Sequence, residues 1–336
     1  MKYLLPQWFA GLALTAFLLA GCDKGEDAEL SIAGIAVANP DFQELEDAAL
    51  RGGVVTTLSN KNPADPEGNF TVFAPNNDAF ARLGLRTATD LLALDQTFLQ
   101  QTLLYHVGNG TIAGSALRIG NASASALGPT RRLTSRGGVL YVNGSRILAT
   151  DVKASNGMIH VVDKVLLATG ADITTSAVAL SSAKVFTQPE LTYLVAALQL
   201  CDLTGALTKT ANSPQFTVFA PNDQAFKNLL QQLGLPITNP AADVRSIAAK
   251  VGGVAVLKTV LLNHVLAGDA GDKFTSELPE NVTLTPLGGS SLTMGAFNNG
   301  LLTVKENGNP TPANMVIPDV QCTNGVVHVI DQVLLP

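Results

Sequence analysis

The chain carries the same long pattern twice, and this repeat limits what it can fold into more than any other feature. The segment Phe70–Phe80 returns as Phe216–Phe226 with nine of eleven positions identical. Two later blocks return in the same order, at offsets that grow from 146 to 158 and then 168 residues. A solenoid would show a short fixed period instead, so we expect a duplicated globular domain whose second copy has longer loops. The later blocks are Leu103–Val107 with Leu261–Val265, and Asn156–Leu167 with Asn324–Leu335.

The first block predicts a strand followed by a helix. Residues 70–74 form a short β-type run that stops at Pro75. Asn76 or Asn77 can cap a helix behind it, and Asp78 adds a negative charge near the positive end of that helix. The second copy repeats this design with Asn222 and Asp223.

The other blocks add helices before the first strand and further strands after it. An amphipathic pattern over 45–58 predicts a helix, with a counterpart over 191–203. Residues 98–106 predict a helix that runs into a strand at Val107. Asn156-Gly157 is a turn signal, and the mostly apolar run 158–167 suits a strand buried on both faces. Each copy therefore has an α+β pattern, with further short strands expected at 132–134, 139–142 and 146–149.

The first residues predict export. Lys2 precedes an apolar stretch that ends in Leu19-Ala20-Gly21-Cys22, and this layout is typical of a secretory signal over residues 1–21. The stretch is too short for a comfortable membrane span. Leu-Ala-Gly-Cys resembles the lipobox of bacterial lipoproteins, which implies that Cys22 is acylated and anchors the chain to a membrane. The alternative is an ordinary cleaved signal with an accidental cysteine. An anchored chain would belong to the cell envelope and would face the periplasm or the cell surface. The anchor could lie in the inner or in the outer membrane.

The rest of the chain divides into a tether and two domains. Residues 22–30 are short and acidic and suit a flexible link. We expect the domains at 31–168 and 172–336, each long enough to bury a core. The formal net charge of −6 gives no basic surface for nucleic acid.

The three repeated blocks, taken together, resemble the fasciclin (FAS1) domain family. Thr71-Val-Phe-Ala-Pro-Asn76 is similar to the first family signature, the Asn156–Leu167 block to the second, and Tyr105-His106 to the Tyr-His motif between them. The resemblance implies two tandem wedge-like β-sandwiches with helices packed at one side. It also implies a role in cell adhesion or matrix contacts. The second copy departs from the family pattern with Asn263-His264.

The candidate site residues come from this motif. Tyr105, His106, Asn263 and His264 are candidates for partner contact, and the loss of an aromatic ring at Asn263 puts the second copy in doubt. A structural role, tying the middle block to the sheet, is the alternative for the two histidines. His160 and His328 lie in apolar strands, where we expect buried, hydrogen-bonded imidazoles.

The residues predict no catalytic or metal chemistry. A metal site needs three or four converging ligands, and each copy offers two histidines without clustered cysteines or carboxylates. There is no Gly-x-Ser-x-Gly elbow and no glycine-rich phosphate loop. We therefore expect no enzyme, no metal and no cofactor.

The last two cysteines form a separate question. Cys201 and Cys322 both fall in the second copy, and an exported protein meets an oxidising environment in which a disulfide can form. Two buried free thiols are the alternative.

Two classes of function remain. One is a binding or adhesion module on the envelope that contacts protein, glycan or matrix. The other is a lipid or small-molecule binding protein tethered at the membrane, which a large apolar pocket would favour.

Overall fold

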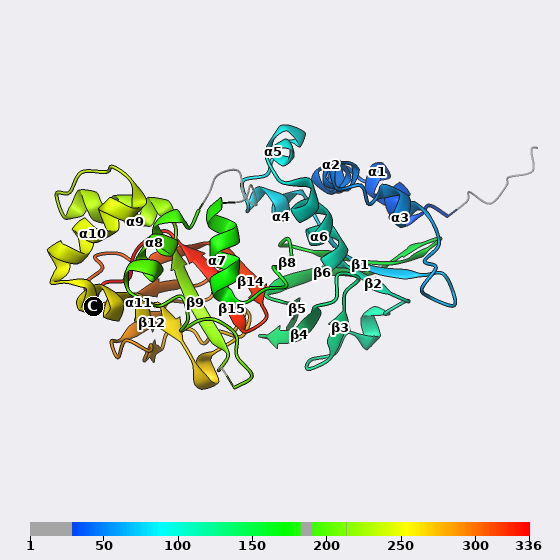
Figure 1. Cartoon of the computed structure of the whole chain (residues 1–336). Coiled ribbons are helices and arrows are strands. Elements are labelled where there is room, and N and C mark those ends of the chain that lie inside the picture. Colours follow the sequence, from blue (N-terminus) through cyan, green and yellow to red (C-terminus); the bar gives the residue numbers. More distant parts are fainter. Residues whose placement is uncertain (1–28, 183–189, 213) are drawn as a thin grey trace, which may run out of the picture.

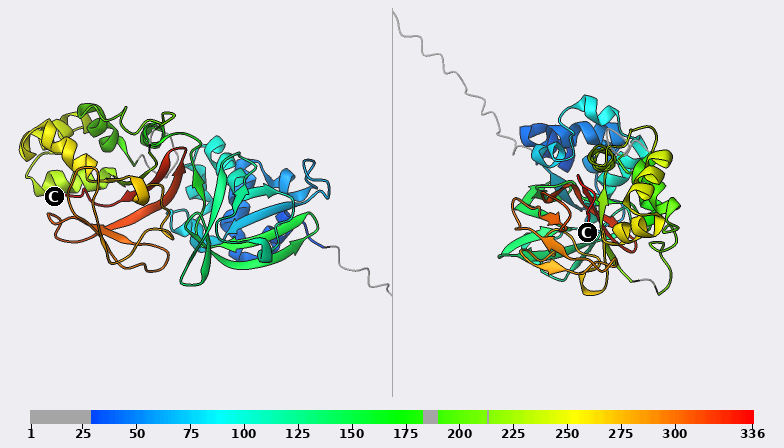
Figure 2. Two further views of the ribbon diagram at one scale, coloured as in Figure 1. Left: turned by 90° about the horizontal axis from the view of Figure 1, so that it is seen from below. Right: turned by 90° about the vertical axis from the view of Figure 1, so that its left-hand side faces the viewer.

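The computed structural model describes residues 29–182, 190–212 and 214–336, and it folds as two domains that lie end to end (Figures 1 and 2). Each domain has a layer of helices packed on a curled sheet. The predicted α+β class and the two tandem domains of one plan are confirmed. The predicted signal over 1–21, the acylated Cys22 and most of the tether lie outside the described residues.

The first domain is built around a central strand that comes from the first repeated block. Strand β1 (Phe70–Pro75) is buried along its whole length and pairs in parallel with β7 (Gly157–Val162). Its helices are α1 (Ile32–Ala38), α2 (Gln43–Gly52), α3 (Val55–Ser59), α4 (Asn77–Ala81), α5 (Ala88–Leu92) and α6 (Gln96–His106). The sheet runs in the order β2 (Val107–Asn109), β1, β7, β6 (Ser145–Ala154), β5 (Val139–Val142), β4 (Thr130–Arg136), β3 (Ala122–Ala124).

The second domain repeats this plan. Strand β9 (Phe216–Pro221) pairs in parallel with β15 (Gly325–Ile330), in the same register as β1 with β7. Its helices are α7 (Ile173–Ser182), α8 (Thr192–Leu200), α9 (Asp223–Gln232), α10 (Pro240–Val251) and α11 (Val254–Leu262). The sheet order is β10 (Val265–Leu266), β9, β15, β14 (Ala313–Cys322), β13 (Thr303–Lys305), β12 (Leu292–Met294), β11 (Thr283–Leu284).

Two segments differ from the sequence prediction. The expected helix over 45–58 is two helices, because Gly53 adopts a left-handed conformation (φ 71°) that ends α2. The expected strand over 158–167 stops at Val162. Residues Leu167–Ala168 then form a separate strand, β8, which pairs with β14 of the second domain. The predicted end of the first domain at residue 168 therefore lies inside the sheet of the second.

Each domain buries apolar side chains on both faces of its sheet. One core lies between sheet and helices, and it continues from the first domain into the second through Leu167 and Val320. A smaller core fills the inside of each curled sheet, around Phe73 in the first domain and Phe219 in the second. Full burial of such a phenylalanine stabilises the fold by about 1.5–3 kcal/mol.

Candidate functional site

The motif histidines, His106 and His264, link the third repeated block of each copy to the end of the helix that precedes them. In the first domain, His106 Nδ1 lies 2.7 Å from the Thr102 carbonyl, and its Nε2 accepts a hydrogen bond from the Leu166 amide at 2.9 Å. His264 makes the same pair of contacts with Val260 and Leu334. Burial lowers the pKa of both histidines to about 4, so they are neutral at pH 7. Their role is structural.

The prediction that this motif meets a partner is wrong for the folded chain. Tyr105 and Asn263 are 0% exposed and both histidines are 2% exposed. The Tyr105 hydroxyl instead donates to Gln321 of the second domain and accepts from Asn143. The Asn263 amide has no hydrogen-bond partner among the described residues. A tyrosine at this position therefore serves the contact between the domains, and the asparagine has no equivalent contact.

The strand histidines are buried and hydrogen-bonded, as predicted. His160 accepts from the Asp151 amide and lies 2.8 Å from the Ile112 carbonyl. His328 repeats this arrangement with Asp319 and Lys273. Groups of three or more His, Cys, Asp or Glu side chains that could hold a metal ion are absent from the described residues.

The centre of the contact between the domains is a buried ion pair. Lys164 Nζ lies 2.7 Å from Asp319 Oδ2 and also donates to Thr275 Oγ1 and the Gly300 carbonyl. Both charged side chains are 7% exposed. Three bonds use all three ammonium hydrogens, which is the condition under which a buried lysine is tolerated. Gly144 packs directly against the Asp319 carboxylate, where any larger residue would overlap it.

Cations of the first domain surround this pair and meet acids and carbonyls of the second. Arg132 binds Asp272 at 2.7 Å and Glu277 at 3.0 Å. Arg136 binds Glu280 and the Leu278 carbonyl. These arginines are more exposed, so each pair adds only about 0–1 kcal/mol. The first domain therefore presents a cationic docking face, and the second an acidic one.

Because the domains are copies, the second domain has its own version of the docking face. In the first domain, Ala79, Leu83 and Val165 line an open groove of about 430 Å³ beside the buried ion pair, and Met315 and Pro318 of the second domain form its far wall. The repeat offsets relate those three residues to Ala225, Leu229 and Val333, which line an open pocket of about 610 Å³. Two cations have changed to amides: Arg82 corresponds to Asn228, and Lys164 to Gln332.

The walls of this pocket are segments that the second copy has gained. Helix α9 has ten residues where α4 has five, and its extra turn adds Gln231 and Gln232. Strands β5 and β6 are joined by Asn143-Gly144 alone. The equivalent strands β13 and β14 are joined by 306–312, which adds Asn309, Pro310 and Thr311.

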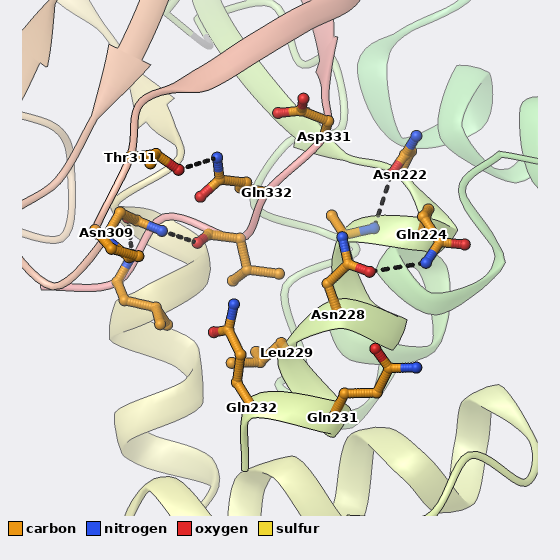
Figure 3. A pocket seen from close by; sticks show the side chains of 14 residues that line it. Asn222, Gln224, Asn228, Leu229, Gln231, Gln232, Asn309, Thr311, Asp331 and Gln332 are labelled. Atoms are coloured by element: carbon orange, nitrogen blue, oxygen red, sulfur yellow. Dashed lines mark hydrogen bonds between the residues drawn. The ribbon is translucent and has the colours of Figure 1, made fainter. Parts of the chain in front are cut away.

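The amides of the pocket are partly fixed (Figure 3). Gln224 Nε2 donates to Asn228 Oδ1 at 2.8 Å, which leaves the Asn228 amide hydrogens available. Gln332 Nε2 donates to Thr311 Oγ1 at 3.2 Å and to the Pro312 carbonyl at 2.9 Å, which leaves its oxygen as an acceptor. Among the described lining residues Asp331 alone is ionisable, and both its oxygens accept from Asn314. The pocket thus offers neutral donors and acceptors together.

The expected Cys201–Cys322 disulfide is absent, and both cysteines are buried free thiols. The Cys322 thiol contacts Ser176 and Thr169 at the start of the second domain, whereas Cys201 follows α8 and faces the Val254 carbonyl. The two side chains therefore have separate surroundings. Burial raises the pKa of the Cys322 thiol to about 11, so it is unreactive at pH 7.

Apolar cavities beneath the helices are small. The cavity between α1, α2 and the sheet of the first domain has a volume of about 70 Å³, and its counterpart in the second domain about 30 Å³. Sites for small molecules usually measure about 300–1,000 Å³. Neither cavity holds a lipid chain without a rearrangement. In the described part of the chain, every helix is too short or too polar to cross a bilayer.

Sequence reasoning missed Lys164, Asp319 and the amide pocket. A signal for Lys164 was present, because a lysine interrupts the apolar block of the first copy where the second copy has Gln332. The repeated motifs do not reveal the pocket, because part of its lining, such as Gln231, Gln232 and Asn309, lies in insertions outside them.

Comparison with known proteins identifies the family. A model described as "Fasciclin domain" matches residues 40–168 and 189–336. These segments make up more than half of the chain, and the chain belongs to the fasciclin domain family.

Individual relatives are similar to parts of the chain. It is 28% identical over 271 residues to transforming growth factor-beta-induced protein ig-h3 of Sus scrofa, a match that covers 80% of this chain and 35% of that protein. It is 37% identical over 142 residues to protein sll1483 of Synechocystis, which covers 42% of this chain and 75% of the relative. The chain thus spans about a third of ig-h3. A solved FAS1 domain pair from the insect cell adhesion molecule Fasciclin I aligns over 88% of this chain and 96% of that one, at 19% identity and a TM-score of 0.37.

Proposed function

We propose that this chain is a non-enzymatic, adhesion-type binding protein of the cell envelope. Its lipid anchor would be Cys22, and its contact site the open pocket of the second domain. Membership of the fasciclin family supports the adhesion-type role. The repeated histidines and Asp163 and Asp331 have structural hydrogen bonds, so the features shared by the two copies need no catalytic explanation.

The open pocket is the observation that carries this proposal. A groove that the second domain closes on one side in the first copy has no neighbouring domain in the second copy, where it has walls and hydrogen-bonding groups of its own. The buried ion pair supports a rigid arrangement in which the second domain lies beyond the first, away from the start of the described chain (Figure 1). A tether at the other end would then present the pocket outward.

Two measurements test the proposal. Cys22→Ser should move the protein from the membrane to the soluble fraction, and a mutant that stays in the membrane contradicts the lipid anchor. Cells that lack the chain should attach several-fold less well to their natural surface, and the wild-type chain should restore attachment. Unchanged attachment contradicts the adhesion-type role.

A further inference from the structure

We propose that the pocket of the second domain binds a neutral, polyhydroxylated carbohydrate chain. This inference rests on the proposed function and names the class of ligand for the same site. It follows from the chemistry of the walls, from the position of the available hydrogen-bonding atoms, and from the charges that the second copy has lost.

The chemistry of the walls favours hydroxyl groups. A sugar hydroxyl both donates and accepts, and a primary amide offers both functions on one side chain. Asn228 presents amide hydrogens and Gln332 a carbonyl oxygen, while Gln231 and Gln232 make no side-chain hydrogen bond within the described part of the chain. A run of vicinal hydroxyls can satisfy all of these groups.

The orientation of two amides is set before a ligand arrives. The bond from Gln224 fixes which end of the Asn228 amide faces the pocket, and the two bonds to Thr311 and Pro312 do the same for Gln332. A group that is already ordered loses less conformational entropy on binding. Apolar atoms of Leu229 and Val333, which line the same pocket, can contact the C–H groups of a sugar ring.

The charges of the lining argue against anionic ligands. An acidic glycan, a phosphate or an acidic protein face needs cations, and two cations that line the equivalent groove, Arg82 and Lys164, are amides here. The inserted loop 306–312 occupies the position where the short Asn143-Gly144 turn admits a neighbouring domain in the first copy. Asp331 adds a negative charge to the lining. This charge disfavours an anionic ligand further.

The size of the pocket suits a few sugar residues of a longer chain. Its volume of about 610 Å³ lies within the usual range for ligand sites, and its open form lets a chain enter and leave. A short stretch of an envelope or matrix polysaccharide would fit in such a pocket while the rest of the chain extends outside it. Weak binding at the pockets of many copies of the protein adds up through avidity.

The test is a titration of the full-length chain in detergent. Neutral oligosaccharides of three to six sugars and alginate oligosaccharides of the same length serve as probes, with calorimetry as the readout. We expect a neutral probe to bind at least ten-fold more tightly than the acidic one. Asn228→Ala together with Gln332→Ala should weaken that binding at least ten-fold. Gln101→Ala removes an exposed amide from α6 of the first domain and should change nothing.

Three results would overturn the proposal: no neutral probe binds, the acidic probe binds better, or the double variant binds like the wild type. The cell-attachment assay separates this failure from failure of the proposed function. If attachment depends on the chain but survives the double variant, the adhesion-type role stands and the carbohydrate pocket does not.

Discussion

The docking face of the first domain contacts a neighbouring domain, whereas the equivalent face of the second domain has no such neighbour. In the first, Lys164 leaves the apolar block and enters the second domain, where Asp319, Thr275 and Gly300 satisfy its ammonium group. In the second, Gln332 holds that position, stays at the surface and bonds to the inserted loop. The repeat thus contains two equivalent faces, and a few substitutions and two insertions distinguish the one that contacts a neighbouring domain from the one that is open.

The largest expected effect concerns the buried ion pair. Lys164→Met should lower the free energy of unfolding by about 3–5 kcal/mol, because it leaves the Asp319 carboxylate buried without its partner. Gln332→Met at the equivalent surface position should change it by less than about 0.5 kcal/mol. Chemical denaturation of the full chain measures both. Equal losses would contradict the difference between the two faces, and Asp319→Asn should recover part of the Lys164→Met loss.

The next effect concerns a feature that the copies share. The motif histidines have a folded pKa of about 4 and an ordinary unfolded pKa of about 6.5, so the unfolded state binds more protons between these values. Stability should therefore fall as the pH drops from about 6.5 to 4, by up to about 3 kcal/mol for each histidine. His106→Gln and His264→Gln should each reduce this pH dependence by a similar amount.

Urea midpoints at pH 7 and pH 4.5 test this expectation. Burial raises the pKa of Glu306 to about 7, which lowers stability as the pH rises through that range and opposes the histidines. The measurement is therefore best made with Glu306→Gln present throughout. A midpoint that is constant or rises toward pH 4.5 would contradict the structural role of these imidazoles.

A smaller effect concerns Tyr105 and Asn263, the residues that directly precede the two motif histidines. Tyr105→Phe should destabilise the chain by about 1 kcal/mol, since it removes the hydrogen bonds of the buried hydroxyl to Gln321 and Asn143, which keep their bond to each other. Asn263→Leu should be neutral or stabilising by about 1 kcal/mol, since the asparagine amide is buried without a partner in the described structure. Thermal unfolding of the two variants gives the signs. Destabilisation by both would mean that Asn263 has a contact equivalent to that of Tyr105.

The smallest effect concerns the thiols. Reduction should leave the mass of the folded chain unchanged, because Cys201 and Cys322 are free. Alkylation of both should require unfolding. If reduction instead adds the mass of two hydrogens, Cys201 and Cys322 form a disulfide and this prediction is wrong.

Much of the fold could be predicted from the repeated blocks. The strand at Phe70, the helix capped by Asn76 and the helix that ends at His106 follow local rules of propensity and capping, and all are present. The buried histidines of the strands also followed from their apolar neighbours. Such features depend on nearby residues, and both copies carry them.

The site depended on long-range contacts and was not predictable in this way. Tyr105 was predicted to meet an outside partner, yet its partner is Gln321, which is 216 residues away. Strand β8 leaves its own domain for β14 because Leu167 pairs with Val320. No pattern within one copy encodes a contact between copies, and the insertions that build the pocket have no counterpart in the repeat.

Amine labelling of the full chain with Gln332→Lys tests the central claim most directly. Each copy then carries a lysine at the same position of the same face, and mass spectrometry gives the acetylation rate of both. We expect the lysine introduced at position 332 to react like an exposed lysine, and Lys164 to react at least a hundred-fold more slowly. Equal rates would contradict the account, because they would mean that the first face is as open as the second.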